Sequence, residues 1–418
     1  MTEISVLGNN YYKTNVLGEG SFGSVVTVYN DDGDTFAMKI FKKESDDYDD
    51  SDIDSTGSSN ENKEDAPTLD VGTLREISIL SMCSLFSSST PTEKPPLHTN
   101  LITMSDITFN QEGEICMIMP KMSLDLYDAI KKDLLSVRCK VNIAYRLLSV
   151  LDFLHKNDII HRDIKTENIL LNDDMRPFIA DFSLAKVFGN NEVETGHTHT
   201  GEMGTQVYKA PEVIKKKRYN KSCDVYSLGV VFLELFNGLL KVDNDIKAQD
   251  FINGILSKLS DKALPLMIKS MLNPDKEKRI TCEDAMKLPI FSRFEKRPTE
   301  KVLNKQVNSI KYRRTNLSKK DKKKCKVFKD DIHRKWSLLG YKNPITKDAA
   351  RIYYDMLSDS KQGEENFYIH CLILAAKLYE TELLSFSTVK ENIKSFDPYQ
   401  YVKDEVEIFK CFDYCLFI

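Results

Sequence analysis

Four polar residues at fixed spacing constrain this chain more than any other feature. Asp163 is followed by Lys165 and Asn168, and a second aspartate, Asp181, begins the run Asp-Phe-Ser. The spacing is that of a phosphoryl-transfer loop, in which an acid orients a hydroxyl proton, a lysine neutralises phosphate charge and side-chain oxygens bind magnesium. A polar turn between two buried strands would use the same residue types, because they are common in turns. The motifs around these residues, found in a single order, favour the phosphoryl-transfer interpretation.

A glycine-rich segment near the start of the chain is the first of these motifs. It predicts nucleotide contacts along Leu17, Gly18, Glu19, Gly20, Ser21, Phe22, Gly23, Ser24 and Val25. Glycine lets the backbone approach phosphates closely, and Phe22 would cover them from solvent. In a Rossmann fold a similar pattern opens a helix. Here the segment lies between two strand-like runs, 12–17 and 25–29, and this context favours a hairpin that covers the phosphates.

One lysine in an apolar strand indicates a buried ion pair. Lys39 lies in the strand-like run 36–40, and a charge buried there without a partner is costly. Glu76, in the helix-like run 74–80, is the predicted partner. The pair would hold Lys39 against the phosphates of a nucleotide only while that helix is docked. Taken singly, each residue would be a solvated surface charge, but their order along the chain favours the ion pair.

Two downstream segments complete the pattern. The run 204–212 resembles the end of an activation segment, and Glu212 is predicted to pair with Arg279. Asp224 resembles the helix acid that anchors the backbone of a catalytic loop. Taken together, the motifs resemble those of eukaryotic-type protein kinases over roughly residues 12–296.

This resemblance implies a bilobal α+β fold, with a β-rich amino-terminal lobe and an α-rich carboxy-terminal lobe, that uses ATP and Mg²⁺. It implies that Asp163 is the catalytic acid or base and that Lys165 and Lys39 hold phosphates. Asn168 and Asp181 would bind the metal. The residues expected around the adenine, including the hinge, are Ala37, Met119 and Met122.

The resemblance also bears on the subfamily. Lys165, two residues after the catalytic acid, resembles serine/threonine kinases rather than tyrosine kinases, so the expected substrates are proteins with serine or threonine. The run 72–80 resembles the cyclin-contacting helix of cyclin-dependent kinases. The same likeness puts an activating phosphothreonine at Thr200, paired with Arg162. Thr195, Thr198 and an unmodified loop stay open as alternatives.

Ser183 departs from the family pattern, which usually has glycine after Asp-Phe. Serine keeps the backbone amide but has less freedom at positive φ, so we expect it to restrict flipping of the Asp181 turn. This departure supports a rival hypothesis, a catalytically weak kinase-fold scaffold that recruits partners. A dead kinase would more readily have lost Lys39, Asp163 or Asp181.

The net charge of −4 conceals two opposed blocks. Residues 44–70 are acidic and poor in large apolar residues, which predicts a disordered insertion; a solvated loop without function is favoured over a regulatory one. Residues 300–335 are basic, with few aromatic residues among the charges, so nucleic-acid binding is not expected. A solvated linker is the leading interpretation. Nuclear import through the lysine-rich stretch 311–326 is the second.

Cysteine usage and hydropathy indicate the compartment. Nine cysteines are scattered without metal-ligand spacing, and Cys411 with Cys415 fit one helix face better than a zinc site. We expect a reducing compartment. No apolar signal region or bilayer-length apolar run is present, so the sequence predicts an intracellular protein, cytoplasmic or nuclear, without membrane contact.

The carboxy-terminal region has the pattern of short amphipathic helices, around 349–357, 367–380, 389–393 and 402–417. Their order resembles a cyclin box, and the likeness puts Lys377 and Glu405 where cyclins contact the kinase helix. A cyclin-like domain would then activate the kinase in cis, a fusion that suggests a large DNA virus as the source. An unrelated helical bundle stays open, as does a constitutive kinase whose bundle recruits substrates. The predicted divisions are a tail 1–11, a kinase domain 12–299, a linker 300–335 and a cyclin-box-like domain 336–418.

Overall fold

The computed structural model describes most of residues 10–41, 70–85, 100–187, 206–294 and 367–379. It also describes strand residues 2–5 and separate residues between 336 and 408; the gaps within these ranges are 21–22, 111–113, 242–247 and 261. Most of the expected acidic insertion (44–69) and the whole expected basic linker (300–335) lie outside the described residues. Ser21, Phe22 and Thr200 also lie outside them.

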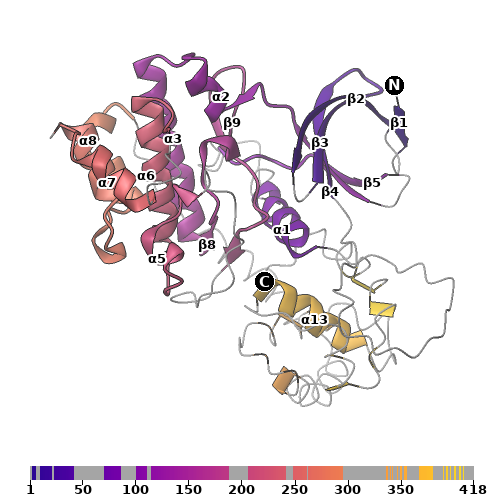
Figure 1. Ribbon diagram of the computed structural model, residues 1–418. Helices are drawn as coiled ribbons and strands as arrows, with labels where there is room; N and C mark the ends of the chain where they lie inside the picture. The colour runs from indigo at the N-terminus through magenta and orange to yellow at the C-terminus, as the bar shows by residue number, and fades with distance from the viewer. Residues whose placement is uncertain are drawn as a thin grey trace, which may run out of the picture.

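An antiparallel sheet of six strands forms the amino-terminal lobe (Figure 1). Its strands are β1 (Thr2–Ser5), β2 (Asn10–Gly20), β3 (Gly23–Asn30), β4 (Thr35–Phe41), β5 (Asp106–Phe109) and β6 (Ile115–Pro120). Their order across the sheet is β1-β2-β3-β4-β6-β5. The predicted glycine-rich hairpin is confirmed, because β2 and β3 pair antiparallel through Gly20 and Gly23.

The predicted tail over residues 1–11 includes a strand. Residues Thr2–Ser5 pair antiparallel with β2 as the edge strand β1, and β2 already begins at Asn10. Backbone hydrogen bonds to β2 satisfy this segment, which is too short for its own pattern to predict a strand.

Alternation along β4 separates two cores. Met38 packs with Val26 and Val28 on one face of the sheet. Its neighbours Ala37 and Lys39 point to the other face, because successive side chains of a strand alternate. Helix α1 (Val71–Leu85) covers that second face (Figure 1).

Local sequence explains where α1 begins and which side it buries. The carboxylate of Asp70 accepts a hydrogen bond from the backbone N–H of Thr73 (2.9 Å), which is an N-cap interaction. Leu74, Ile77 and Leu80 recur at helical spacing and are fully buried. Glu76 lies on the same buried side.

The carboxy-terminal lobe is built on two long helices. Helix α3 (Val137–Lys156) starts at Ser136, whose hydroxyl accepts from the Cys139 N–H (3.3 Å). Helix α6 (Ser222–Asn237) is buried from Cys223 to Leu235 and is therefore the central helix of this lobe. The remaining helices are α2 (Leu126–Lys131), α5 (Pro211–Ile214), α7 (Ala248–Leu256), α8 (Ala263–Met271) and α9 (Cys282–Met286). Two small sheets, β7 (Leu124–Asp125) with β9 (Ile169–Leu171) and β10 (Pro177–Ile179), and β8 (Ile159–Ile160) with β11 (Lys186–Val187), support the loops between the lobes.

Helix α13 (Phe367–Tyr379) dominates the described part of the carboxy-terminal region. It packs against α1 and β11 of the preceding lobes (Figure 1). Residues 349, 350, 353, 354, 404, 405 and 408 are helical, within the predicted helices 349–357 and 402–417. Among the described residues, no helix has the length and apolar character needed to cross a membrane.

Candidate active site

A buried carboxylate fixes the backbone of the loop that carries Asp163. Asp224, on α6, is fully buried and accepts hydrogen bonds from the N–H groups of His161 and Arg162, both at 2.9 Å. His155 Nε2 lies 3.0 Å from the same carboxylate. Burial alone would raise the pKa of Asp224, but its hydrogen bonds to His155 and the loop outweigh burial and lower it. The predicted anchoring role of Asp224 is therefore confirmed in its geometry, and Arg162 adopts a left-handed conformation with φ of 67°.

Asp163 is held by the two residues that the spacing predicted. Its Oδ2 accepts from Asn168 Nδ2 at 2.8 Å and lies 2.9 Å from Lys165 Nζ. The side chain of Asp163 is 14% exposed and that of Lys165 is 22% exposed, so both stay reachable from solvent. One carboxylate oxygen is thus restrained by the protein while the group remains open to a substrate hydroxyl.

Lys39 and Glu76 form the predicted ion pair. Nζ of Lys39 lies 2.6 Å from Glu76 Oε2 and 3.6 Å from Asp181 Oδ1. Burial alone would lower the pKa of Lys39, but the charges of Glu76 and Asp181 outweigh burial and raise it. Burial raises the pKa of Glu76 to about 7, against the opposing charge of Lys39. The lysine therefore remains a cation between two carboxylates, one from α1 and one from the Asp-Phe-Ser turn.

Two side chains, those of Asn168 and Asp181, each have an oxygen that could bind a cation. Asn168 uses its Nδ2 to donate to Asp163, so its Oδ1 is its remaining polar atom. The N–H of Ala180 donates to the Asn168 carbonyl (3.0 Å), which brings the residue before Asp181 against Asn168. Among the described residues, no group of three or more His, Cys, Asp or Glu side chains could hold a metal. Two hard oxygens suit Mg²⁺, which keeps water and phosphate ligands.

The nucleotide side of the site has the expected cross-strand order. Ala37 pairs with Met119, and Lys39 pairs with Val25, so the predicted adenine and phosphate contacts follow one another along β4. A Cβ on Gly18 would project into open space, whereas a Cβ on Gly23 would lie 2.0 Å from the Ile40 carbonyl oxygen. Only glycine fits at Gly23, where φ is 147°. Glycine at this position therefore lets β3 pair closely with β4 at the end of the hairpin.

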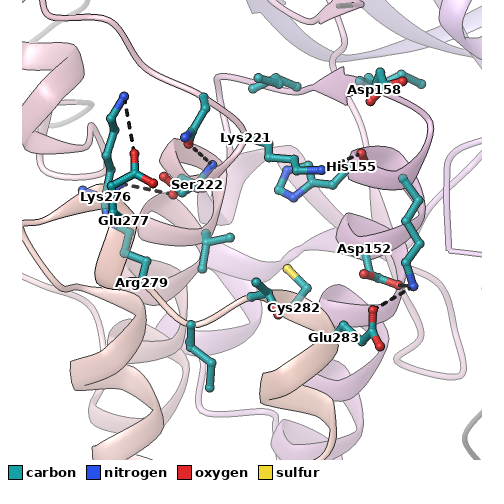
Figure 2. Close-up of a pocket in the computed structure, with 17 residues that line it drawn as sticks. Asp152, His155, Asp158, Lys221, Ser222, Lys276, Glu277, Arg279, Cys282 and Glu283 are labelled. Atoms are coloured by element: carbon teal, nitrogen blue, oxygen red, sulfur yellow. Dashed lines mark hydrogen bonds and ion pairs between the residues drawn. The ribbon is translucent and has the colours of Figure 1, made fainter. Parts of the chain in front are cut away.

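The segment beyond the site is anchored by a second buried ion pair, as predicted. Arg279 donates from Nη1 and Nη2 to the two carboxylate oxygens of Glu212, at 2.5 and 2.7 Å. The Arg279 side chain is 0% exposed and stacks its guanidinium over Tyr226. In Figure 2, Arg279 and His155 lie in the wall of a cavity of about 760 Å³ between α3, α6 and residues 276–283. The cavity lies behind the loop anchors and away from Asp163.

Arg75 of α1 lies close both to α13 and to Arg162, the residue before Asp163. The sequence did not indicate this connection. Its Nη2 donates to the carbonyl oxygen of Lys377 in α13 at 3.5 Å. Burial and the charge of nearby Arg162 lower the pKa of Arg75 to about 10. Arg162 donates to the Leu184 carbonyl (2.6 Å) and to the hydroxyl of Tyr219 (3.0 Å). The motif around Glu76 contains Arg75, but neither spacing nor charge indicated its partner, which lies 302 residues away in the sequence.

Lys377 and Glu405, the two residues predicted to contact α1, form an ion pair with each other. Lys377 Nζ is 2.6 Å from Glu405 Oε1, and the Tyr401 hydroxyl donates to the same oxygen at 2.6 Å. Both residues are buried. The pair therefore joins α13 to Glu405 within the carboxy-terminal region, and the main-chain carbonyl of Lys377 accepts a hydrogen bond from Arg75 of α1.

Comparison with known proteins shows that most of the chain is similar to protein kinases. Residues 11–291 match a family model described as "Protein kinase domain". Three similar proteins come from Arabidopsis thaliana. The G-type lectin S-receptor-like serine/threonine-protein kinase SD1-13 is 31% identical over 244 residues, 56% of this chain and 25% of that protein.

Two other G-type lectin S-receptor-like serine/threonine-protein kinases are similar. At1g11330 is 38% identical over 150 residues, 34% of this chain and 17% of that protein. B120 is 28% identical over 245 residues, 57% of this chain and 25% of that protein. The chain thus spans a quarter or less of the length of these three relatives.

The Arg279–Glu212 pair generates a stability prediction. Arg279→Met should lower the free energy of unfolding by about 3–5 kcal/mol, because it leaves the Glu212 carboxylate buried without a cation. Urea unfolding followed by circular dichroism measures the change. Lys287→Met is the matched control: it removes an exposed lysine that pairs with Glu283 and Asp284, and exposed pairs stabilise little. Equal stability of the Arg279 and Lys287 variants would contradict the anchoring role.

Proposed function

Since the chain belongs to the protein kinase family through residues 11–291, we propose that it is a serine/threonine protein kinase. It transfers the γ-phosphoryl group of ATP to serine or threonine hydroxyls of protein substrates. The observation that carries the proposal is that one site brings together Asp163, Lys165, Asn168, Asp181 and the Lys39–Glu76 pair. A scaffold without catalysis would not need to keep all of these groups in contact.

Each residue has a role that follows from its contacts. Asp163 accepts the proton of the attacking hydroxyl, held in orientation by Asn168. Lys165 stands beside Asp163 and neutralises charge on the transferred group. Lys39, kept cationic by Glu76, holds the phosphates. ATP would supply the phosphoryl group, and Asn168 and Asp181 would hold a Mg²⁺ ion that offsets phosphate charge when bound.

Substitution of Asp163 or of Lys39 tests the catalytic roles assigned to them. Asp163→Asn and Lys39→Met should each lower kcat by about 10²–10⁴-fold, because both groups act on charge that develops during transfer. Phosphate incorporation into a generic serine/threonine substrate measures the loss, and circular dichroism verifies the fold. Normal turnover by a folded Asp163→Asn protein would refute the assignment.

Activation through a phosphate near Arg162 extends the proposal. Arg75 and Arg162 are neighbouring guanidinium groups, and the Nε of Arg75 is buried without a hydrogen-bond partner among the described residues. Two like charges held together favour an anion between them, and arginine binds phosphate well. Thr200, ten residues before Ala210, is the proposed phosphorylation site.

This activation hypothesis predicts that active protein carries phosphate on Thr200. Thr200→Ala should lower kcat by roughly tenfold or more, because the arginine pair then lacks its counter-ion. Tandem mass spectrometry locates the phosphate, with Thr195→Ala and Thr198→Ala as matched controls. An unmodified Thr200 together with a fully active Thr200→Ala variant would overturn it.

The proposal also includes regulation in cis. A cyclin-like domain, residues 336–418 after a linker 300–335, would activate the kinase domain of the same chain. This regulation is supported by helix α13, which packs against α1, the helix that carries Glu76, and against β11, the strand that follows the Asp181 turn. The guanidinium of Arg75 lies near the carboxyl end of α13, where a cation is favourable. Contacts that hold α1 inward raise the population that contains the ion pair. The predicted contacts of Lys377 and Glu405 to α1 and the viral source stay predictions.

Removal of the carboxy-terminal region measures how strongly it activates the kinase domain. A chain ending at Pro298 should be about a hundredfold less active, since each loss of about 1.4 kcal/mol in docking lowers the active population tenfold. Arg75→Gln in the full chain should lower activity in the same direction, with Arg138→Gln on the exposed face of α3 as control. Full activity of the truncated chain would instead favour a bundle that recruits substrates.

A further inference from the structure

Ser183 occupies a position where it can act on Asp181 directly. Its hydroxyl donates a hydrogen bond to Asp181 Oδ1 at 2.7 Å, and its backbone N–H approaches the same oxygen at 3.4 Å. Ser183 is 2% exposed, so this hydroxyl is shielded from competing water. The contact is between a neutral hydroxyl and an ionised acceptor, which is a strong type of hydrogen bond.

All recorded contacts of the Asp181 carboxylate fall on one oxygen. Oδ1 receives the two bonds from Ser183 and lies 3.6 Å from Lys39 Nζ. Among the described residues, Oδ2 accepts no hydrogen bond. The Asp181 side chain is 31% exposed, so Oδ2 can be reached by a cation. By holding Oδ1, the serine hydroxyl therefore leaves Oδ2 of Asp181 as the oxygen that faces a cation.

The backbone explains why serine is tolerated here. Asp181, not Ser183, adopts the left-handed conformation, with φ of 61°. Ser183 does not need positive φ in this arrangement, and the expectation that it restricts flipping of the Asp181 turn stays a prediction. Serine costs no backbone strain at a position outside the left-handed region, and it adds a hydrogen-bond donor that glycine lacks.

Helix α1 makes room for this serine. A Cβ built on Gly72 would lie 3.3 Å from Ser183 Cβ, 3.3 Å from the Ser183 carbonyl oxygen and 2.8 Å from Asp70 Oδ2. The first turn of α1 thus packs directly on Ser183, and only a residue without a side chain fits at Gly72 without displacement. Docked α1 closes over the hydroxyl that holds Asp181.

We propose that Ser183 is a positioning residue for the divalent cation: its hydroxyl holds Oδ1 of Asp181 and so presents Oδ2 to Mg²⁺. The inference rests on the proposed kinase function, because Mg²⁺ is the expected partner of Asp181. Ser183 touches neither nucleotide nor substrate in this role. It acts through Asp181, and the docked first turn of α1 keeps it in place.

Metal affinity of the full-length protein tests the proposal without relying on catalysis. Ser183→Ala and Ser183→Gly both remove the hydroxyl and add no atoms to a buried position, so neither introduces a clash. With a non-hydrolysable ATP analogue bound, Mn²⁺ titration followed by electron paramagnetic resonance should give a Kd about tenfold higher in both variants. Affinity for the analogue without metal should be unchanged. In turnover assays both variants should have a lower kcat than the wild type at low Mg²⁺. A higher Mg²⁺ concentration should restore most of that loss.

The control variant is Ser257→Ala, which removes an exposed hydroxyl that donates to the Gly254 carbonyl at 2.9 Å. It should leave Mn²⁺ affinity at the wild-type value. Unchanged Mn²⁺ affinity in both Ser183 variants would overturn the proposal, as would an equal loss in Ser257→Ala. Failure of the kinase proposal is a separate outcome, because the wild-type protein would then transfer no phosphate while the Mn²⁺ comparison could still be made.

Discussion

The buried ion pair between Lys39 and Glu76 is the interaction on which the rest of the site depends. Lys39 comes from the sheet and Glu76 from α1, and their charged atoms are 2.6 Å apart. If α1 moved away, Lys39 would be left buried with Asp181 as its nearest carboxylate at 3.6 Å. Loss of one partner of a buried pair is costly, so the state with α1 docked is the one in which phosphates can be held. Whatever positions α1 therefore regulates the site.

Three contacts in the structure act on the position of α1. Gly72 lets its first turn pack on Ser183, next to Asp181. Arg75, near the amino-terminal end of α1, donates to the carbonyl of Lys377 and so ties α1 to α13. Helix α13 also packs directly against α1. The loop that carries Asp163, by contrast, is anchored by hydrogen bonds from its backbone to Asp224 on α6. The loop that carries Asp163 is thus anchored by α6, whereas the Lys39–Glu76 pair depends on the position of α1.

Local patterns predicted the elements of the site, but not the contacts between distant segments. The spacing of Asp163, Lys165 and Asn168 was sufficient because these groups lie within one short loop. Lys39 with Glu76, and Glu212 with Arg279, were predictable because a buried charge needs a partner of opposite sign. The link from Arg75 to Lys377 uses a main-chain carbonyl, which has no signature in sequence. The role of Ser183 depends on its hydroxyl contact with Asp181 and on positive φ at Asp181, and the sequence alone indicates neither.

Amide hydrogen exchange across α1 tests most directly whether the carboxy-terminal region holds this helix. The comparison is between the full chain and a chain ending at Pro298, with the amides of Val71–Leu85 as the probe and those of α6 as the internal reference. The account predicts that exchange in α1 becomes faster by at least tenfold on truncation while α6 stays protected. Equal protection of α1 in both proteins would contradict it.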